Sequence, residues 1–142
     1  MALPEPVLSA EALSGILVSA FGEGVPRVDE VTDDGVVIRL PISERNVRPG
    51  GTVSGPTMMM LADTAAWVAL MSRAGAELLA VTTSLQIDFL RKPHVADLVA
   101  RARIVKFGSA LVVTTVDLHS ANSPDLVATA SVTYSRPRQP SA

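Results

Sequence analysis

The stretch SGPTMMMLADTAAWVALMS, residues 54–72, decides the fold of this chain. Ser54 can accept hydrogen bonds from the free amides of a helix start, and Pro56 suits an early helical position where no N–H is needed. The residues that follow are apolar on nearly every side of a helix, which predicts a buried helix that runs from Ser54 to about Ser72. Asp63 is the only charged residue within it.

The charge at the middle of this helix also argues against a membrane span. An ionised carboxylate at the centre of a bilayer costs roughly 3 kcal/mol, so burial inside protein is the better interpretation. Residues 1–11 contain neither Lys nor Arg and no long apolar run, which argues against a secretory leader. We therefore expect a cytoplasmic protein without a membrane partner, whose mature chain begins near Met1.

The segments around the helix have the composition of strands. Ser9 can open a short helix that stops near Gly22. An Asp-Asp-Gly turn at 33–35 predicts a hairpin of strands 28–31 and 36–40, and four more strands are predicted at 79–90, 98–106, 111–119 and 126–134. Leu85, Ile87 and Phe89 share one face of their strand, as in a sheet with one buried side. Short connections favour hairpins, so we expect a largely antiparallel sheet that the long helix covers.

Length and composition restrict the classes of protein. With 142 residues we expect one domain, 1–142, which includes an N-terminal helical segment (1–24) and a C-terminal tail (135–142). A net charge of −2 supplies no general attraction to nucleic acid. The absence of Cys excludes disulfides, thiolate metal ligands and a Cys nucleophile. The two His lack the spaced co-ligands of a metal site, so no metal is expected.

The position of Asp63 requires an explanation, because an ionised carboxylate in an apolar helix is unfavourable unless it is paired, hydrogen-bonded or open to a cleft. One interpretation is structural: Asp63 accepts a hydrogen bond from Thr64, or from a partner across an interface, and fixes the register. The other interpretation is catalytic. The start of the same helix presents the Gly55 N–H and a positive dipole end, which suit a developing oxyanion.

The spacing of these two residues has a consequence for assembly. Gly55 and Asp63 are eight residues apart, which is roughly 12 Å along a helix axis. One carbonyl group cannot contact both. If both act on one substrate, one of them belongs to a second chain, and antiparallel pairing of two such helices across a two-fold axis brings them together. We therefore expect a homodimer with shared sites, and we expect such dimers to pair into a tetramer.

Several motifs resemble those of the phenylacetate-pathway (PaaI-like) group of hotdog-fold thioesterases, and the likeness covers most of the chain. The matching residues are Asn46, Ser54-Gly55-Pro56, Met60 to Ala65 and Ile87 to Arg91. The resemblance implies an α+β hotdog fold, in which an antiparallel sheet wraps around one long central helix. It also implies hydrolysis of acyl-CoA with no cofactor other than the CoA of the substrate. In this group the helix usually begins His-Gly-Gly with the catalytic acid nine residues after the His, and Ser54 to Asp63 keeps that spacing.

The resemblance also implies roles for individual residues. Gly55 corresponds to the glycine whose amide polarises the thioester carbonyl, and Asp63 corresponds to a general base or nucleophile supplied by the neighbouring subunit. Asn46 resembles a loop residue that helps to place the substrate or water. Thr82 stands where related enzymes carry a hydroxyl that orients the attacking water, although an ordinary strand hydroxyl explains it equally well.

This sequence departs from the group at two positions, where Ser54 replaces the usual His and Pro56 replaces the second Gly. Pro56 contributes no amide, so altered substrate choice or lower activity is expected. Further substrate contacts are assigned to Ser54, Met59, Trp67 and Arg91. The methionines 58–60 are also interpretable as core residues. Arg91, with Lys92, Lys106 and Arg136, is a candidate for the phosphates of CoA or simply a solvated strand end.

The leading hypothesis is hydrolysis of a medium-sized or aromatic acyl-CoA to the free acid and CoA. The alternative is a non-catalytic hotdog module that binds acyl-CoA or a lipid-like effector, because the His-Gly-Gly signature is lost. A hydratase of the same fold ranks lowest, since such enzymes typically pair an acid with a His. A Ser-His-Asp hydrolase is poorly supported, because no His is positioned to activate Ser54 or Thr57.

Overall fold

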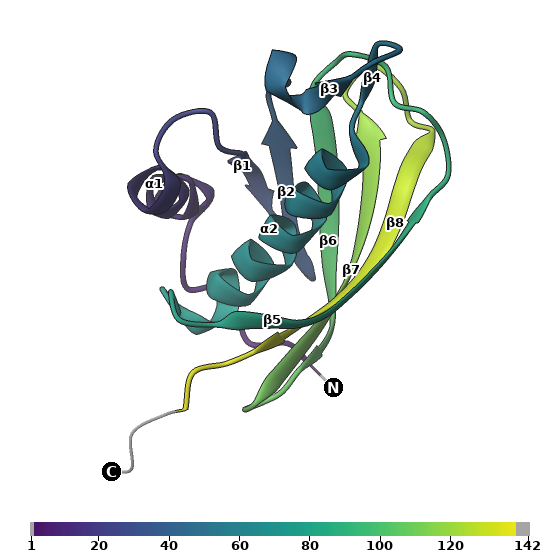
Figure 1. Ribbon diagram of the computed structural model, residues 1–142. Coiled ribbons are helices and arrows are strands. Elements are labelled where there is room, and N and C mark those ends of the chain that lie inside the picture. Colours follow the sequence, from purple (N-terminus) through teal and green to yellow (C-terminus); the bar gives the residue numbers. More distant parts are fainter. Residues whose placement is uncertain (1, 139–142) are drawn as a thin grey trace.

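The computed structural model describes residues 2–138, in which a curved sheet wraps around the long helix α2 (Gly55–Ala74) (Figure 1). The six strands of the sheet are, in spatial order, β1 (Arg27–Val31), β2 (Gly35–Leu40), β6 (Leu98–Phe107), β7 (Leu111–Ser120), β8 (Leu126–Ser135) and β5 (Val81–Phe89). All neighbouring strands are antiparallel. The predicted α+β hotdog architecture, a sheet wrapped around one long helix, is confirmed. Residues 139–142 of the predicted tail lie outside the described residues.

Helix α2 begins and ends where local chemistry dictates. The Ser54 hydroxyl accepts from the Thr57 N–H at 3.3 Å, so the predicted cap is confirmed. Gly75 ends the helix with φ 95°, a conformation that Gly adopts more readily than other residues. The helix thus runs two residues beyond the predicted Ser72. In the described part of the chain, neither helix is long and apolar enough to cross a membrane.

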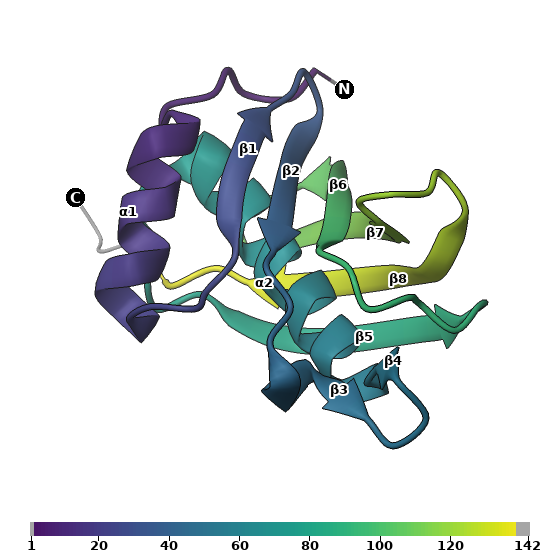
Figure 2. The ribbon, with the colours of Figure 1, turned by 90° about the horizontal axis from the view of Figure 1, so that it is seen from above.

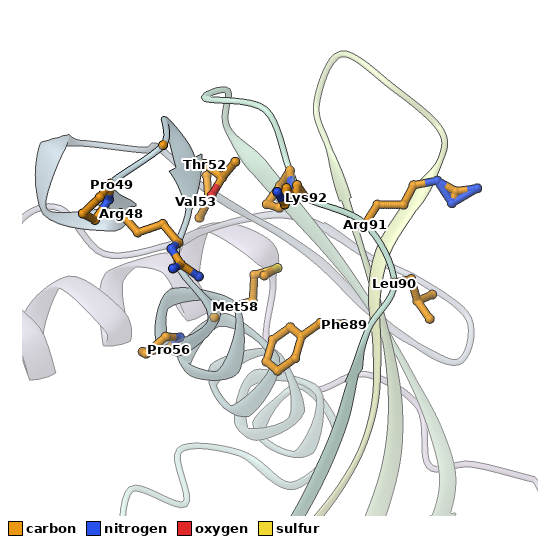
Figure 3. A pocket seen from close by; sticks show the side chains of 13 residues that line it. Arg48, Pro49, Thr52, Val53, Pro56, Met58, Phe89, Leu90, Arg91 and Lys92 are labelled. Carbon is orange, nitrogen blue, oxygen red and sulfur yellow. The ribbon is translucent and has the colours of Figure 1, made fainter.

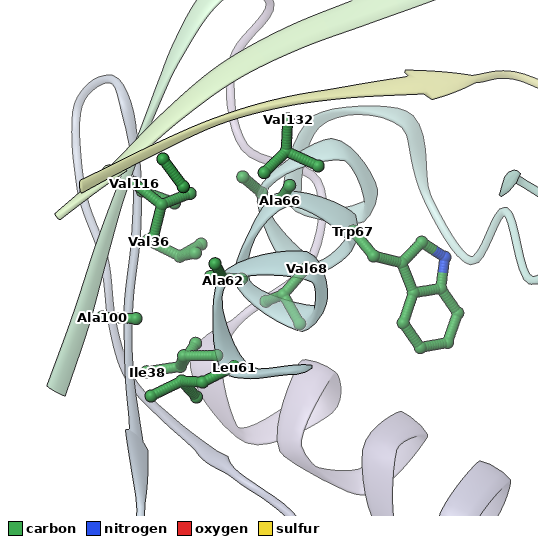
Figure 4. Packing of buried hydrophobic residues seen from close by; sticks show 14 of the residues in the cluster. Val36, Ile38, Leu61, Ala62, Ala66, Trp67, Val68, Ala100, Val116 and Val132 are labelled. Carbon is green, nitrogen blue, oxygen red and sulfur yellow. The ribbon is translucent and has the colours of Figure 1, made fainter. Parts of the chain in front are cut away.

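The core lies between α2 and the concave face of the sheet (Figure 4). On the helix, Leu61 and Val68 are fully buried. On the sheet, Ile38 of β2 and Val116 of β7 are buried in the same core. Small side chains at Ala62, Ala65, Ala66 and Ala69 allow the helix to lie close to the strands. The prediction of a helix buried on nearly every side is confirmed. Apart from its terminal residues Gly55 and Ala74, only one stripe of α2 is partly exposed, and it contains Pro56, Met59, Met60, Asp63 and Thr64.

The two edges of the sheet differ. Helix α1 (Ala10–Phe21), capped by Ser9 as predicted, packs beside β1 and covers that edge (Figure 2). At the opposite edge, β5 pairs with β8 on one side, and no other described strand lies on its second side. Its open edge therefore presents unpaired backbone groups to solvent or to another chain.

One expectation about the sheet is wrong. The strands predicted at 79–90 and 98–106 do not form a hairpin, because β5 pairs with β8 and the connection 90–97 carries the chain across to β6. The amides of Leu90 and Arg91 donate to the Val127 carbonyl at the start of this crossing. Alternation of apolar residues indicates which face of a strand is buried, but it does not identify the neighbouring strand.

The last turn of α2 is tied to the β1–β2 turn by a buried arginine. The Arg73 guanidinium, 4% exposed, donates to the carbonyls of Thr32 (2.7 Å), Asp33 (2.8 Å) and Gly35 (3.3 Å). A further bond reaches the carbonyl of Pro4 at 3.3 Å. Burial lowers the pKa of Arg73 from its usual value, and nearby acidic residues, Asp34 first, oppose this effect.

Candidate active site

A cleft of about 650 Å³ opens at the N-terminus of α2 (Figure 3). Its apolar wall includes Val53, Met58 and Phe89, and its rim carries Arg48 and Lys92. None of the residues that line it is acidic. The cleft therefore combines an apolar surface with positive charge, an arrangement that suits a ligand with an apolar body and anionic groups.

Gly55 lies at the first position of α2, on the wall of this cleft. The first amides of a helix have no partner inside the helix and lie at its positive end. A Cβ on Gly55 would lie 3.5 Å from the Phe89 ring, which is an ordinary van der Waals distance, so the start of the helix packs beside this aromatic side chain. Gly55 can thus offer an N–H donor on an apolar wall.

A polar network holds the loop in front of the cleft against the helix start. This loop contains the short helix η1 (Glu44–Asn46) and the hairpin of β3 (Val47–Arg48) and β4 (Thr52–Val53). The Asn46 carbonyl accepts from the Ser54 N–H at 2.8 Å, and the Asn46 amide donates to Thr57 Oγ1 at 3.3 Å. The hydroxyls of Ser54 and Thr57 are 2.8 Å apart. The structure thus brings Asn46, Ser54 and Gly55 together.

Asp63 lies in a second group of residues, near the start of β5. Its Oδ1 accepts from the Thr82 hydroxyl at 2.6 Å and from the Tyr134 hydroxyl at 3.0 Å. The Thr64 hydroxyl donates instead to the Met60 carbonyl at 2.8 Å, so the proposed bond between Thr64 and Asp63 is wrong. A Thr in the middle of a helix can bond its own preceding turn, which is what Thr64 does.

Tyr134 is a site residue that sequence reasoning missed. It lies on β8, 71 residues from Asp63 in sequence, and only its alternation with Val132 indicated an inward-facing side chain. Burial raises the pKa of Tyr134 well above its usual value; the Thr82 hydroxyl opposes this effect, and the nearby Asp63 charge adds to it. The hydroxyl therefore remains protonated, and able to donate, over any ordinary working range of pH.

The two groups of residues lie at opposite ends of β5. Asp63 contacts Thr82 near the beginning of this strand, whereas Gly55 approaches Phe89 at its end. A single chain therefore does not bring the Gly55 amide and the Asp63 carboxylate together. This agrees with the separation expected from their spacing along the helix.

Two of the residues assigned to substrate binding lie away from the cleft. The Trp67 indole donates to the Glu77 carbonyl at 3.1 Å, and its ring packs edge-on against Phe21 of α1 with the ring centres 5.9 Å apart. These contacts account for its burial. Met59 is 41% exposed on the stripe of α2 and does not line the cleft.

The basic residues divide into those at the cleft and those elsewhere. Arg48 points into the cleft, whereas Arg91 borders it but directs its guanidinium away (Figure 3). Arg48 was not assigned a role from sequence, because its position in a loop gives no indication of its direction. Arg136 forms a salt bridge with Glu77, with a shortest contact of 2.6 Å, and its guanidinium stacks over the Phe107 ring.

The two His take no part in either group. The Nδ1–H of His119 lies 2.8 Å from the Ser120 carbonyl and 3.0 Å from that of Ser123, and so can hold the β7–β8 turn. His94 is exposed in the connection 90–97. Within residues 2–138, no three His, Cys, Asp or Glu side chains form a group that could hold a metal ion.

Comparison with known proteins identifies the class. A sequence model of the thioesterase superfamily matches residues 50–127, and the chain therefore belongs to this superfamily. Membership makes it a hydrolase that acts on thioesters, and the thioesterase prediction is confirmed at this level. No protein of curated function matches the sequence.

Solved structures agree in fold. A candidate thioesterase from Silicibacter sp. TM1040 shares 39% identity over 94% of this chain and 95% of its own, with a TM-score of 0.87. Zebrafish thioesterase superfamily member 2 shares 23% identity over 92% and 99%, with a TM-score of 0.79. A thioesterase from Haemophilus influenzae shares 20% identity over 95% and 94%, also with a TM-score of 0.79. At these lower identities, the last two show similarity of fold alone.

Proposed function

We propose that this protein is a PaaI-like acyl-CoA thioesterase with two sites shared between the chains of a homodimer. The observation that carries this proposal is the placement of Gly55 and Asp63 at opposite ends of β5, the strand with an open edge. Thioester hydrolysis requires an oxyanion donor and a base or nucleophile. One group offers the Gly55 N–H as the donor, and the other offers the Asp63 carboxylate. The preference for a medium-sized or aromatic acyl group rests on the resemblance to the PaaI-like group.

The open edge of β5 supports the proposed dimer. Val81 at its beginning and Leu79 just before it are 59% and 80% exposed, and Phe89 at its end and Leu90 just after it are each 50% exposed. A long apolar edge strand is an aggregation hazard unless another chain covers it. Pairing of β5 with its own copy about a two-fold axis is antiparallel, so the beginning of one strand lies beside the end of the other. Thr82 and Asp63 of one chain then approach Gly55 and Phe89 of the partner.

The proposed reaction uses few groups. Water attacks the thioester carbonyl while Asp63 takes its proton, and the Gly55 N–H stabilises the oxyanion that forms. Collapse of this intermediate breaks the C–S bond, and the departing CoA thiolate takes up the proton that Asp63 received, which restores the carboxylate. If Asp63 attacks the carbonyl itself, the oxyanion forms at the same donor and water then hydrolyses the resulting anhydride. Neither route requires a cofactor, and Pro56 supplies no second amide at this helix start.

The cleft supports CoA as the leaving group. Arg48 and Lys92 place positive charge at the rim for phosphates, while Val53, Met58 and Phe89 offer an apolar wall to the pantetheine arm. A cytoplasmic location and pairing of dimers into tetramers complete the proposal.

The proposed function is tested by multi-turnover release of free CoA from a panel of aliphatic and aromatic acyl-CoA esters. We expect turnover by the wild-type protein, highest with medium-sized or aromatic acyl groups. A non-hydrolysable acyl-CoA analogue, measured by calorimetry, gives the affinity of the same sample. Tight binding without release of CoA would instead identify the non-catalytic module.

The contribution of the rim to CoA binding is tested with Arg48→Gln. An exposed ion pair with a phosphate is worth about 1 kcal/mol, so KM for acyl-CoA is expected to rise about fivefold while kcat is unchanged. The KM for the matching acyl-pantetheine ester, which lacks the nucleotide phosphates, is expected to stay the same. Arg101→Gln, at an exposed position on β6, is the matched control. An equal rise in KM for both esters would contradict this role for Arg48.

A further inference from the structure

The Asp63 carboxylate is held by two hydroxyl groups that converge on the same oxygen. Thr82 donates to Oδ1 at 2.6 Å and Tyr134 donates to Oδ1 at 3.0 Å. The Tyr134 hydroxyl also lies 3.2 Å from the Asp63 carbonyl, so it spans the side chain and the backbone of this residue. Among residues 2–138, no hydrogen bond reaches Oδ2. The two carboxylate oxygens are therefore not equivalent.

We propose that Tyr134 is a positioning residue that, together with Thr82, holds Oδ1 of Asp63 and leaves Oδ2 as the oxygen that accepts the proton of water or attacks the thioester. This inference rests on the proposed function, because it concerns the orientation of the Asp63 carboxylate in the proposed reaction. It assigns Tyr134 no contact with the substrate. Tyr134 acts through Asp63 alone.

The sheet register explains why the two hydroxyls converge. Thr82 and Tyr134 lie directly opposite each other in the β5–β8 ladder, so their side chains share the face that meets α2. Immediately beyond this pair, the register of β5 shifts between Thr82 and Ser84. Such bulges change the direction of nearby side chains and often lie next to active sites. The ladder thus places a short and a long hydroxyl side chain where one helical carboxylate receives both.

The physical state of Tyr134 suits a fixed donor. The side chain is 6% exposed, so the surrounding core restricts its rotamer. Because the phenol remains protonated, it donates to the carboxylate at every pH at which the enzyme could work. A hydrogen bond to a charged acceptor is stronger than one between neutral groups, so two of them on one oxygen favour a single orientation of the carboxylate. A carboxylate freed from these bonds would rotate and lose the productive direction of Oδ2.

The inference is tested with Tyr134→Phe, which removes only the hydroxyl. We expect kcat for acyl-CoA hydrolysis to fall about tenfold with KM unchanged, because the substrate does not contact this group. Thr82→Val is expected to have a similar effect, and Thr82→Ser, which restores a hydroxyl, is expected to recover most of kcat. In an Asp63→Asn background, Tyr134→Phe is expected to leave the residual rate unchanged.

A matched control is available on the same face of the sheet. Thr114 of β7 is 1% exposed, and among residues 2–138 its hydroxyl has no hydrogen-bond partner. Thr114→Val therefore removes a buried hydroxyl that holds nothing, and kcat is expected to stay at the wild-type value. Thermal unfolding of all variants shows whether the fold is kept.

The outcomes separate this inference from the proposed function. If the wild-type protein releases no CoA from any ester, the proposed function fails. If the wild-type protein is active and Asp63→Asn is not, but Tyr134→Phe retains the wild-type kcat, only the positioning role fails. A change confined to KM, or an equal loss of rate in the Asp63→Asn background, also overturns it.

Discussion

Asp63→Asn is expected to lower kcat for acyl-CoA hydrolysis by roughly 10²–10⁴-fold and to leave KM nearly unchanged. Asn has almost the same shape as Asp, and its side-chain oxygen can still accept from Thr82 and Tyr134. The substitution removes only the ability to take a proton or to attack a carbonyl. Steady-state release of CoA from the best ester of the panel measures the effect.

The control for this experiment concerns the fold. Because the helix and both hydroxyl donors are retained, the midpoint of thermal unfolding and the dimer fraction are expected to match the wild-type values. Equal kcat in Asp63→Asn and wild type would remove Asp63 from the reaction. In that case the carboxylate would be a structural acceptor for Thr82 and Tyr134.

Mixed dimers are expected to recover activity that neither parent possesses. One parent carries Asp63→Asn and the other carries Gly55→Pro, which removes the proposed oxyanion donor. In the mixed dimer, one shared site combines the intact Gly55 of one chain with the intact Asp63 of the other, and the second site carries both defects. Dimers purified through a different tag on each chain are therefore expected to show about half of the wild-type kcat per dimer.

The structure makes Gly55→Pro a precise probe of the amide. Pro is tolerated at the first helical position, and Ser54 before it already has the extended conformation (φ −71°, ψ 152°) that precedes Pro. Pro56 follows this position and disfavours a helical residue with a Cβ there, a strain that Gly55→Pro shares with Gly55→Ala. Gly55→Ala is the matched control, because it adds a Cβ at an ordinary distance from Phe89 but keeps the N–H. Loss of a single oxyanion donor typically costs about 10²–10³ in kcat.

The mixed dimer also has a clear negative outcome. If each site lay within one chain, every site in the mixed dimer would carry one defect, and activity would not exceed that of the parents. No recovery from stable mixed dimers would contradict the shared site.

The features that sequence predicted correctly depend on residues that are near one another in the chain. The cap at Ser54, the buried helix, and the distance that separates Gly55 from Asp63 along the helix follow from helix geometry alone. The inward face of Leu85 and Ile87, which pack against the core, follows from the period of a strand. None of these requires knowledge of which strands are neighbours.

The features that sequence did not predict depend on tertiary register. Tyr134 and Thr82 both contact Asp63 because β5 pairs with β8. This pairing places Thr82 opposite Tyr134. Neither alternation nor connection length specifies that pairing. The same limit applies to the cleft, where the direction of Arg48 is set by the fold of the β3–β4 loop and not by local pattern.

The hydrogen bonds that Arg73 makes between α2 and the β1–β2 turn have a consequence for how the sequence can vary. At the turn the acceptors of Arg73 are main-chain carbonyls, which every amino acid carries. Most side chains at Thr32 and Asp33 would therefore preserve these hydrogen bonds. Gly35 is an exception, because a Cβ there would lie 1.8 Å from the Ala102 carbonyl oxygen. The donor has no such freedom, since only a guanidinium offers several N–H groups in fixed directions. Mutational tolerance is therefore high in the turn and low at the single arginine that holds it.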